Sequence, residues 1–68
     1  MNYKKLQAAV QRSGMKRGFL AEKMGISDQV MSDRISGKSP WKVPEAAAFC
    51  EVLGLSKKER DEIFFGQE

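Results

Sequence analysis

Hydrophobic residues recur along this chain every three or four positions, in five segments that glycine or proline separates. This spacing is typical of amphipathic helices, and no stretch shows the alternation of a half-buried strand. The predicted helices cover residues 2–13, 17–24, 28–36, 44–53 and a last segment that begins after Ser56 and extends towards Phe65. No repeat, linker or low-complexity tract interrupts them. The pattern therefore predicts a single all-α domain over residues 1–68, a compact five-helix bundle.

Capping residues support most of these boundaries. Ser27 precedes the segment 28–36, and Asp28 stands in its first turn, where the helix dipole favours an acid. Ser56 and Glu59 form an S-x-x-E capping box at the start of the last helix. The segment 17–24 carries the weakest signals, because Gly18 lies inside it and no Ser, Thr or Asp precedes it.

Residues 20–38 read LAEKMGISDQVMSDRISGK, two predicted helices joined by Gly-Ile-Ser. A glycine that permits a left-handed backbone, an apolar anchor and a capping serine are typical of a helix-turn-helix. Met31 and Ile35 are four residues apart and flanked by Val30, so this side of the second helix must face the core. The opposite side carries Asp28, Gln29, Ser32, Asp33 and Ser36. A helix with short polar side chains at its N-terminal end suits the reading of base edges in the major groove.

Composition limits the classes of function. Without histidine and with one cysteine, Cys50, the chain has no ligand set for zinc and no histidine-based triad. We therefore expect no metal, no cofactor, no small-molecule ligand and no enzymatic activity, and we interpret Cys50 as a small core residue. No apolar run approaches the roughly 20 residues of a membrane span. Charges interrupt the N-terminal segment where a signal peptide is apolar, so the sequence favours a cytoplasmic protein.

The charge distribution is uneven. The net charge is +3, but nine Lys/Arg against three Asp/Glu give residues 1–42 a charge of +6, while three against six give residues 43–68 a charge of −3. Such asymmetry favours a cationic face directed at a polyanion, although ordinary solubilising charge would also account for it.

The motifs together identify a family resemblance. FLAEKMGISDQVMSDRISGK, with its SGK at 36–38, and CEVLGLS at 50–56 resemble the Cro and repressor-type (XRE-like) helix-turn-helix family of phages and bacteria. The resemblance covers nearly the whole chain, and short phage-encoded members that end in two aromatic residues are especially similar. It implies a lambda repressor-like DNA-binding domain that acts in transcription regulation. It also implies binding to double-stranded operator DNA, commonly as a homodimer on a two-fold site.

The resemblance also implies roles for individual residues. The base-contacting positions are Asp28, Gln29, Ser32 and Asp33. The positions that contact the DNA backbone are Lys16, Arg17, Ser36, Lys38, Ser39, Trp41 and Lys42. Independently, two cations at the start of the segment 17–24 oppose the helix dipole, a penalty that a bound phosphate would reverse. Of Phe64 and Phe65, one is expected in the core and the other as a dimer contact.

Several alternatives remain open. Asp28 either contacts a base or only complements the helix dipole, and Asp33 either contacts a base, pairs with a neighbour such as Lys38 or is solvated. Trp41 either packs on the DNA backbone or closes the core. An acid near the groove is repelled by phosphates, so these aspartates would add discrimination rather than affinity. The rival functions are an antitoxin-type module and a protein-interaction domain that has lost DNA binding.

Overall fold

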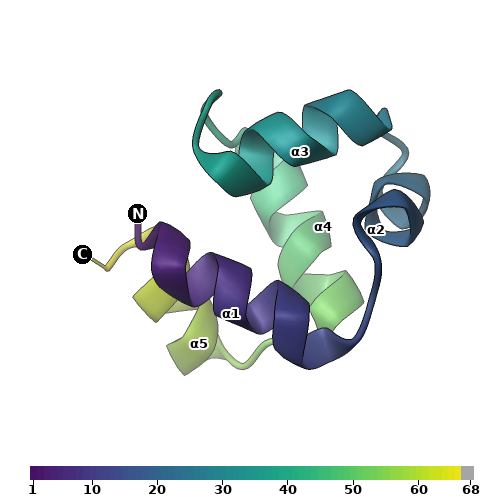
Figure 1. Ribbon diagram of the computed structural model, residues 1–68. Helices are drawn as coiled ribbons and strands as arrows, with labels where there is room; N and C mark the ends of the chain where they lie inside the picture. The colour runs from purple at the N-terminus through teal and green to yellow at the C-terminus, as the bar shows by residue number, and fades with distance from the viewer. Residues whose placement is uncertain (67–68) are drawn as a thin grey trace.

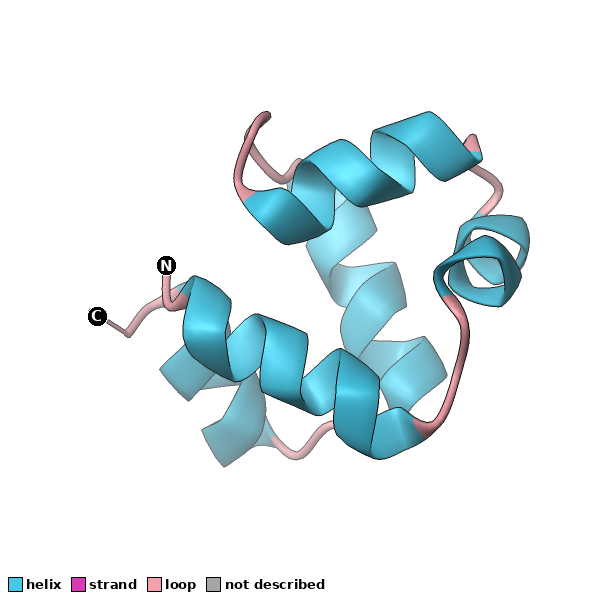
Figure 2. Cartoon of the chain, in the orientation of Figure 1, coloured by secondary structure: helices cyan, strands magenta, loops and turns pink. Residues whose placement is uncertain are grey.

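Five helices form the part of the chain that the computed structural model describes, residues 1–66 (Figure 1). They are α1 (Tyr3–Ser13), α2 (Arg17–Met24), α3 (Asp28–Ser36), α4 (Val43–Leu53) and α5 (Lys57–Phe64). Residues 1–66 contain no strand (Figure 2), which confirms the predicted all-α class. The radius of gyration is 10.7 Å, close to the roughly 11 Å expected of a folded chain of this length. The predicted helix bounds agree with the structure to within a residue or so.

Side-chain caps fix the helix ends that the sequence predicted. The Ser27 hydroxyl accepts a hydrogen bond from the Val30 N–H at 3.1 Å and starts α3. Ser56 and Glu59 form the complete capping box of α5. The end of α3 needs a glycine for two reasons: Gly37 has a φ of +86°, and a Cβ there would lie 3.1 Å from the ring of Tyr3.

The hydrophobic core takes a large buried side chain from every helix. In chain order these are Leu6, Leu20, Met31, Phe49 and Ile63, none more than 3% exposed. α2 packs against α3 and α4, while α1 packs against α3, α4 and α5. Met31 is the residue that the pattern of α3 predicted to face inwards, and that prediction is confirmed.

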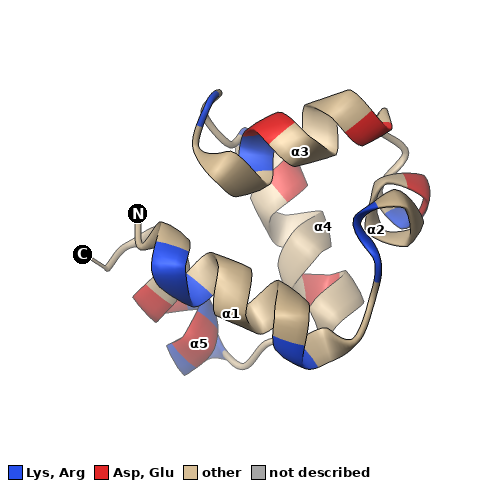
Figure 3. Ribbon diagram, viewed as in Figure 1, with Lys and Arg blue, Asp and Glu red and all other residues tan. Residues whose placement is uncertain are grey.

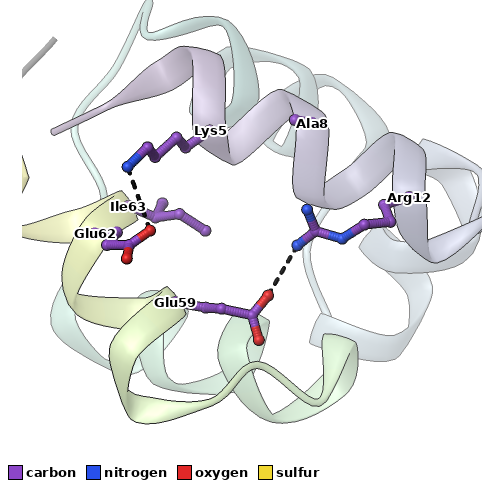
Figure 4. Close-up of a pocket in the computed structure, with 6 residues that line it drawn as sticks. All are labelled: Lys5, Ala8, Arg12, Glu59, Glu62 and Ile63. Atoms are coloured by element: carbon purple, nitrogen blue, oxygen red, sulfur yellow. Dashed lines mark hydrogen bonds and ion pairs between the residues drawn. The ribbon is translucent and has the colours of Figure 1, made fainter.

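α1 and α5 are joined by ion pairs along a shallow pocket (Figure 4). Lys5 Nζ lies 3.3 Å from Glu62 Oε2, and Arg12 Nη2 lies 2.8 Å from Glu59 Oε2. Two carboxylates of α5 thus neutralise two cations of α1. Most of the unpaired positive charge of the first 42 residues therefore lies around α2 and α3.

Candidate nucleic-acid interface

Three residues, Gly25 to Ser27, connect α2 to α3. Gly25 adopts a left-handed φ of +69°, and the N–H of Ile26 donates to the Ala21 carbonyl at 3.0 Å. Ile26 is partly buried against the core, as expected of the anchor in this turn. Figure 1 shows α3 across the view and α2 nearly end-on, so the two helix axes cross steeply. The short turn therefore fixes both the position and the direction of α3.

α3 separates an apolar side from a polar side. Met31 is fully buried, and Ile35 packs partly buried against the core. On the polar side Asp28 and Gln29 are exposed, while Ser32 and Asp33, one turn further on, are half-exposed. The structure thus brings together on one surface the four side chains that the resemblance predicted to contact bases. We call this surface, Asp28, Gln29, Ser32 and Asp33, the polar face of α3.

Each side chain of the polar face has a hydrogen-bond partner within the protein. Gln29 Nε2 donates to Asp33 Oδ1 at 2.9 Å. Arg17 reaches across from α2, with Nε 3.4 Å from Asp28 Oδ1 and Nη1 3.4 Å from Ser32 Oγ. The ion pair between Asp33 and Lys38 that the sequence left open is not present among residues 1–66. Lys38 instead contacts Asp33 through its backbone N–H, which donates to the Asp33 carbonyl at 2.9 Å.

Arg34 organises the loop between α3 and α4, which holds most of the predicted backbone-contacting residues. Its guanidinium lies 2.7 Å from Glu45 Oε1 and donates through Nη1 to Ser39 Oγ at 2.8 Å. The bond to the Glu45 side chain raises the pKa of Arg34. Ser36 Oγ, at the loop entrance, donates to the Asp33 carbonyl at 3.4 Å. Hydrogen bonds therefore link the loop to both neighbouring helices, through Arg34 on α3 and Glu45 on α4.

Trp41 belongs to an aromatic cluster. Its ring meets Phe49 edge-on at 5.0 Å between centroids and Phe64 at 5.3 Å. Its indole N–H donates to the Arg34 carbonyl at 2.9 Å. This arrangement favours the interpretation that Trp41 closes the core, because the N–H that could bind a phosphate already has an acceptor.

Lysines flank the polar face of α3 at both ends. Lys16 precedes α2, and Lys38 and Lys42 lie in the loop after α3; all three are exposed. Within the described part of the chain none of the three forms an ion pair. Figure 3 shows blue on the segment that enters α2 and on the loop that leaves α3, on either side of the red positions of the α3 ribbon. The polar face is thus bordered by cations that are free to bind an anion.

The two C-terminal phenylalanines divide as the sequence predicted. Phe64 is half-buried in the cluster with Trp41, whereas Phe65 is 78% exposed. Val43, at the start of α4, is 83% exposed and lines the same shallow groove as Phe65. Phe65 is therefore the better placed of the two for a contact with another molecule.

Two side chains that hold this region together were missed by sequence reasoning. Arg34 lies on α3 but turns towards α4, where Glu45 accepts from its Nε and Nη2. Glu45 also accepts from the Lys42 N–H at 3.0 Å, so the spacing of an acid three residues after a helix cap was the available signal.

Cys50 is half-buried on α4, and burial raises the pKa of its thiol, in keeping with a structural role.

No family model matches the chain, and no curated protein or solved structure shows significant similarity to it. No helix in residues 1–66 is long and apolar enough to cross a membrane. The candidate interface therefore stands on its geometry and charge.

Proposed function

We propose that this protein is a sequence-specific DNA-binding regulator of transcription, in which α2 and α3 act as a helix-turn-helix. The observation that carries the proposal is the polar face of α3, bordered at both ends by lysines without ion-pair partners in residues 1–66. α3 enters the major groove with this face, while Met31 on its other side anchors it in the core. Base edges then meet Gln29 and Ser32 directly.

The chemistry of the side chains assigns the contacts. The Gln29 amide can pair with N6 and N7 of adenine, and the Ser32 hydroxyl serves a donor or an acceptor. The carboxylate of Asp33 accepts from an amino group of cytosine or adenine. Lys16, Lys38 and Lys42 contact phosphates and supply most of the affinity, which falls as salt concentration rises.

The protein acts by occupancy, as a homodimer on a palindromic operator. Two α3 helices then lie in successive major grooves, roughly 34 Å apart. The protomer measures 26 × 23 × 20 Å, so two neighbouring copies can place their α3 helices at that separation without overlapping. Phe65 and Val43 offer an apolar surface for the contact between them.

The direct test is selection of bound sites from a random DNA pool, followed by a gel shift in moderate salt with selected and random duplexes. We expect a two-fold symmetric consensus and clearly tighter binding to it. Equal binding to both duplexes would overturn the proposal.

The exposed apolar surface also favours a second candidate, a protein-interaction module, of antitoxin type or without DNA binding. In that case Phe65 and Val43 would contact a different protein. A gel shift identifies a module without DNA binding, because it leaves selected and random DNA equally free. An antitoxin-type domain also binds operator DNA, so a complex with a different protein is what would distinguish it.

A further inference from the structure

Arg17 is the first residue of α2, yet its guanidinium lies against α3. Nε is 3.4 Å from Asp28 Oδ1, and Nη1 is 3.4 Å from Ser32 Oγ. Asp28 and Ser32 are one helical turn apart, so the guanidinium bridges two successive positions of the polar face of α3. We propose that Arg17 reads a guanine in the major groove and that Asp28 is the positioning residue that holds it there. This inference rests on the proposed DNA-binding function.

The donors of Arg17 fit this role. A guanidinium has five N–H donors in one plane, and the two contacts to α3 occupy only one on Nε and one on Nη1. The amino group Nη2 has no partner among residues 1–66, and the Arg17 side chain is 52% exposed. Nη1 and Nη2 together can therefore donate to N7 and O6 of guanine, the usual bidentate pairing of arginine with a base.

The surroundings favour a base over a phosphate as the ligand. Asp28, 60% exposed, sits beside the guanidinium and would repel a phosphate approaching the same site. Lys16, the preceding residue, has no ion-pair partner in the described chain and is the better phosphate ligand. An acid on a DNA-binding face lowers non-specific affinity, and orienting Arg17 is the function that offsets this cost.

Gly18 follows Arg17 directly and lies close to Asp28. A Cβ added there would lie 3.8 Å from Asp28 Oδ1, an ordinary contact, so the ion pair does not depend on a glycine at this position. The pair itself is exposed and contributes little to stability. Its value is that it restricts the rotamers of a long side chain before DNA binds.

The proposal reassigns two residues relative to the sequence resemblance. Arg17 moves from the DNA backbone to a base, and Asp28 acts through Arg17 rather than on a base of its own. The resemblance and the present proposal therefore differ in which base pair substitutions of Arg17 and Asp28 affect, and this difference can be measured.

The experiment measures affinities for the selected operator and for variants with each base pair of one half-site changed. The proteins are wild type, Arg17→Lys, Asp28→Asn and the double variant, with Asp61→Asn as matched control because Asp61 lies on α5 and pairs with Arg60. Arg17→Lys keeps the charge but loses the bidentate fork. We expect it to reduce discrimination at one G·C pair by roughly 5- to 150-fold. Asp28→Asn should weaken discrimination at the same pair, and the double variant should be no worse than Arg17→Lys.

Three results would overturn the inference. Asp28→Asn could weaken discrimination at a base pair other than the one that Arg17→Lys affects, with additive losses in the double variant. That result would mean that Asp28 reads a base itself. Arg17→Lys could leave every base preference unchanged, which would return Arg17 to a phosphate. In both cases wild type still prefers its operator, and the proposed function stands. If wild type shows no base preference at any position, the proposed function is wrong and the inference falls with it.

Discussion

The carboxylate of Glu45 and the guanidinium of Arg34 form a two-point ion pair between α4 and α3. Nε lies 2.7 Å from Oε1 and Nη2 lies 3.2 Å from Oε2, and the two side chains are only 11% and 15% exposed. Because the same guanidinium also donates to Ser39 Oγ, this pair links the end of α3 and the following loop to α4. The Arg34 carbonyl separately accepts from the indole N–H of Trp41. The pair therefore positions the polar face rather than contacting its ligand.

Stability should depend on pH through Glu45. Its hydrogen bond from Arg34 holds the pKa of the Glu45 carboxyl below its usual value. The contribution is thus complete above the unfolded-state pKa of about 4.3 and is lost as pH falls through the lower folded-state pKa. We expect wild type to lose more free energy of unfolding than Glu45→Gln between pH 6 and pH 3, measured by urea denaturation. The pKa of Glu59 is also lowered, by hydrogen bonds from Ser56. The pH dependence of stability that Glu59 contributes is the same in both proteins and does not affect the comparison. Identical pH profiles would show that the ion pair does not stabilise the fold.

Met31 should anchor α3. Because its side chain is fully buried, Met31→Ala leaves a cavity and should lower the free energy of unfolding by about 2–5 kcal/mol. Ser32→Ala, on the half-exposed side of the same helix, should change it much less. Urea denaturation monitored by circular dichroism measures both. A small loss for Met31→Ala would mean that α3 is held chiefly by its polar contacts.

Gln29 should read one base. Gln29→Ala should cost about 1–3 kcal/mol of operator affinity and relax base preference at a single position. Fluorescence anisotropy with single-base operator variants provides the measurement. Gln11→Ala on the exposed surface of α1 is the matched control, and it should leave the affinity unchanged. Equal losses for Gln29→Ala on all sequences would exclude a base-reading role.

Lysines that border the polar face should act on every DNA sequence alike. Lys38→Ala and Lys42→Ala should each weaken binding uniformly and reduce the slope of log K against log salt by about 0.9. Lys57→Ala on α5 removes an equal charge from an exposed position elsewhere, so its slope should match that of wild type. An unchanged slope for the two loop variants would place the phosphates at another surface.

Phe65 should support dimer formation. Its ring is 78% exposed, so Phe65→Ser should leave the fold intact while lowering both the dimer fraction and the affinity for the two-fold operator. Sedimentation over a range of concentrations gives the dimer fraction. Phe19→Ser is the control, because that ring is 46% exposed and lies on α2, with Lys23 Nζ 5.3 Å from its centroid. If both variants associate like wild type, the dimer uses a different surface.

The helices were predictable because their signals are local. The apolar side of α3 follows from the spacing of Met31 and Ile35, and its start follows from the hydroxyl of Ser27. The partition of Phe64 and Phe65 was also foreseen, since one helix cannot bury two adjacent aromatic rings on one side.

The pairings between helices were not predictable, because they depend on how the elements pack. The bonds from Arg17 to α3 and from Arg34 to Glu45 join separate helices, and no local pattern encodes their distance. For Trp41 the sequence offered two environments of equal merit. Its packing against Phe49 and Phe64 favours the core.

The most direct test of the central claim is a titration of the ¹⁵N-labelled protein with its selected duplex, following backbone amide shifts. The account predicts the largest changes at Asp28, Gln29, Ser32 and Asp33 and in the loop that carries Lys38 and Lys42. The α1–α5 surface around Arg12 and Glu59 should change little. Changes concentrated on that surface, with α3 unperturbed, would contradict the account.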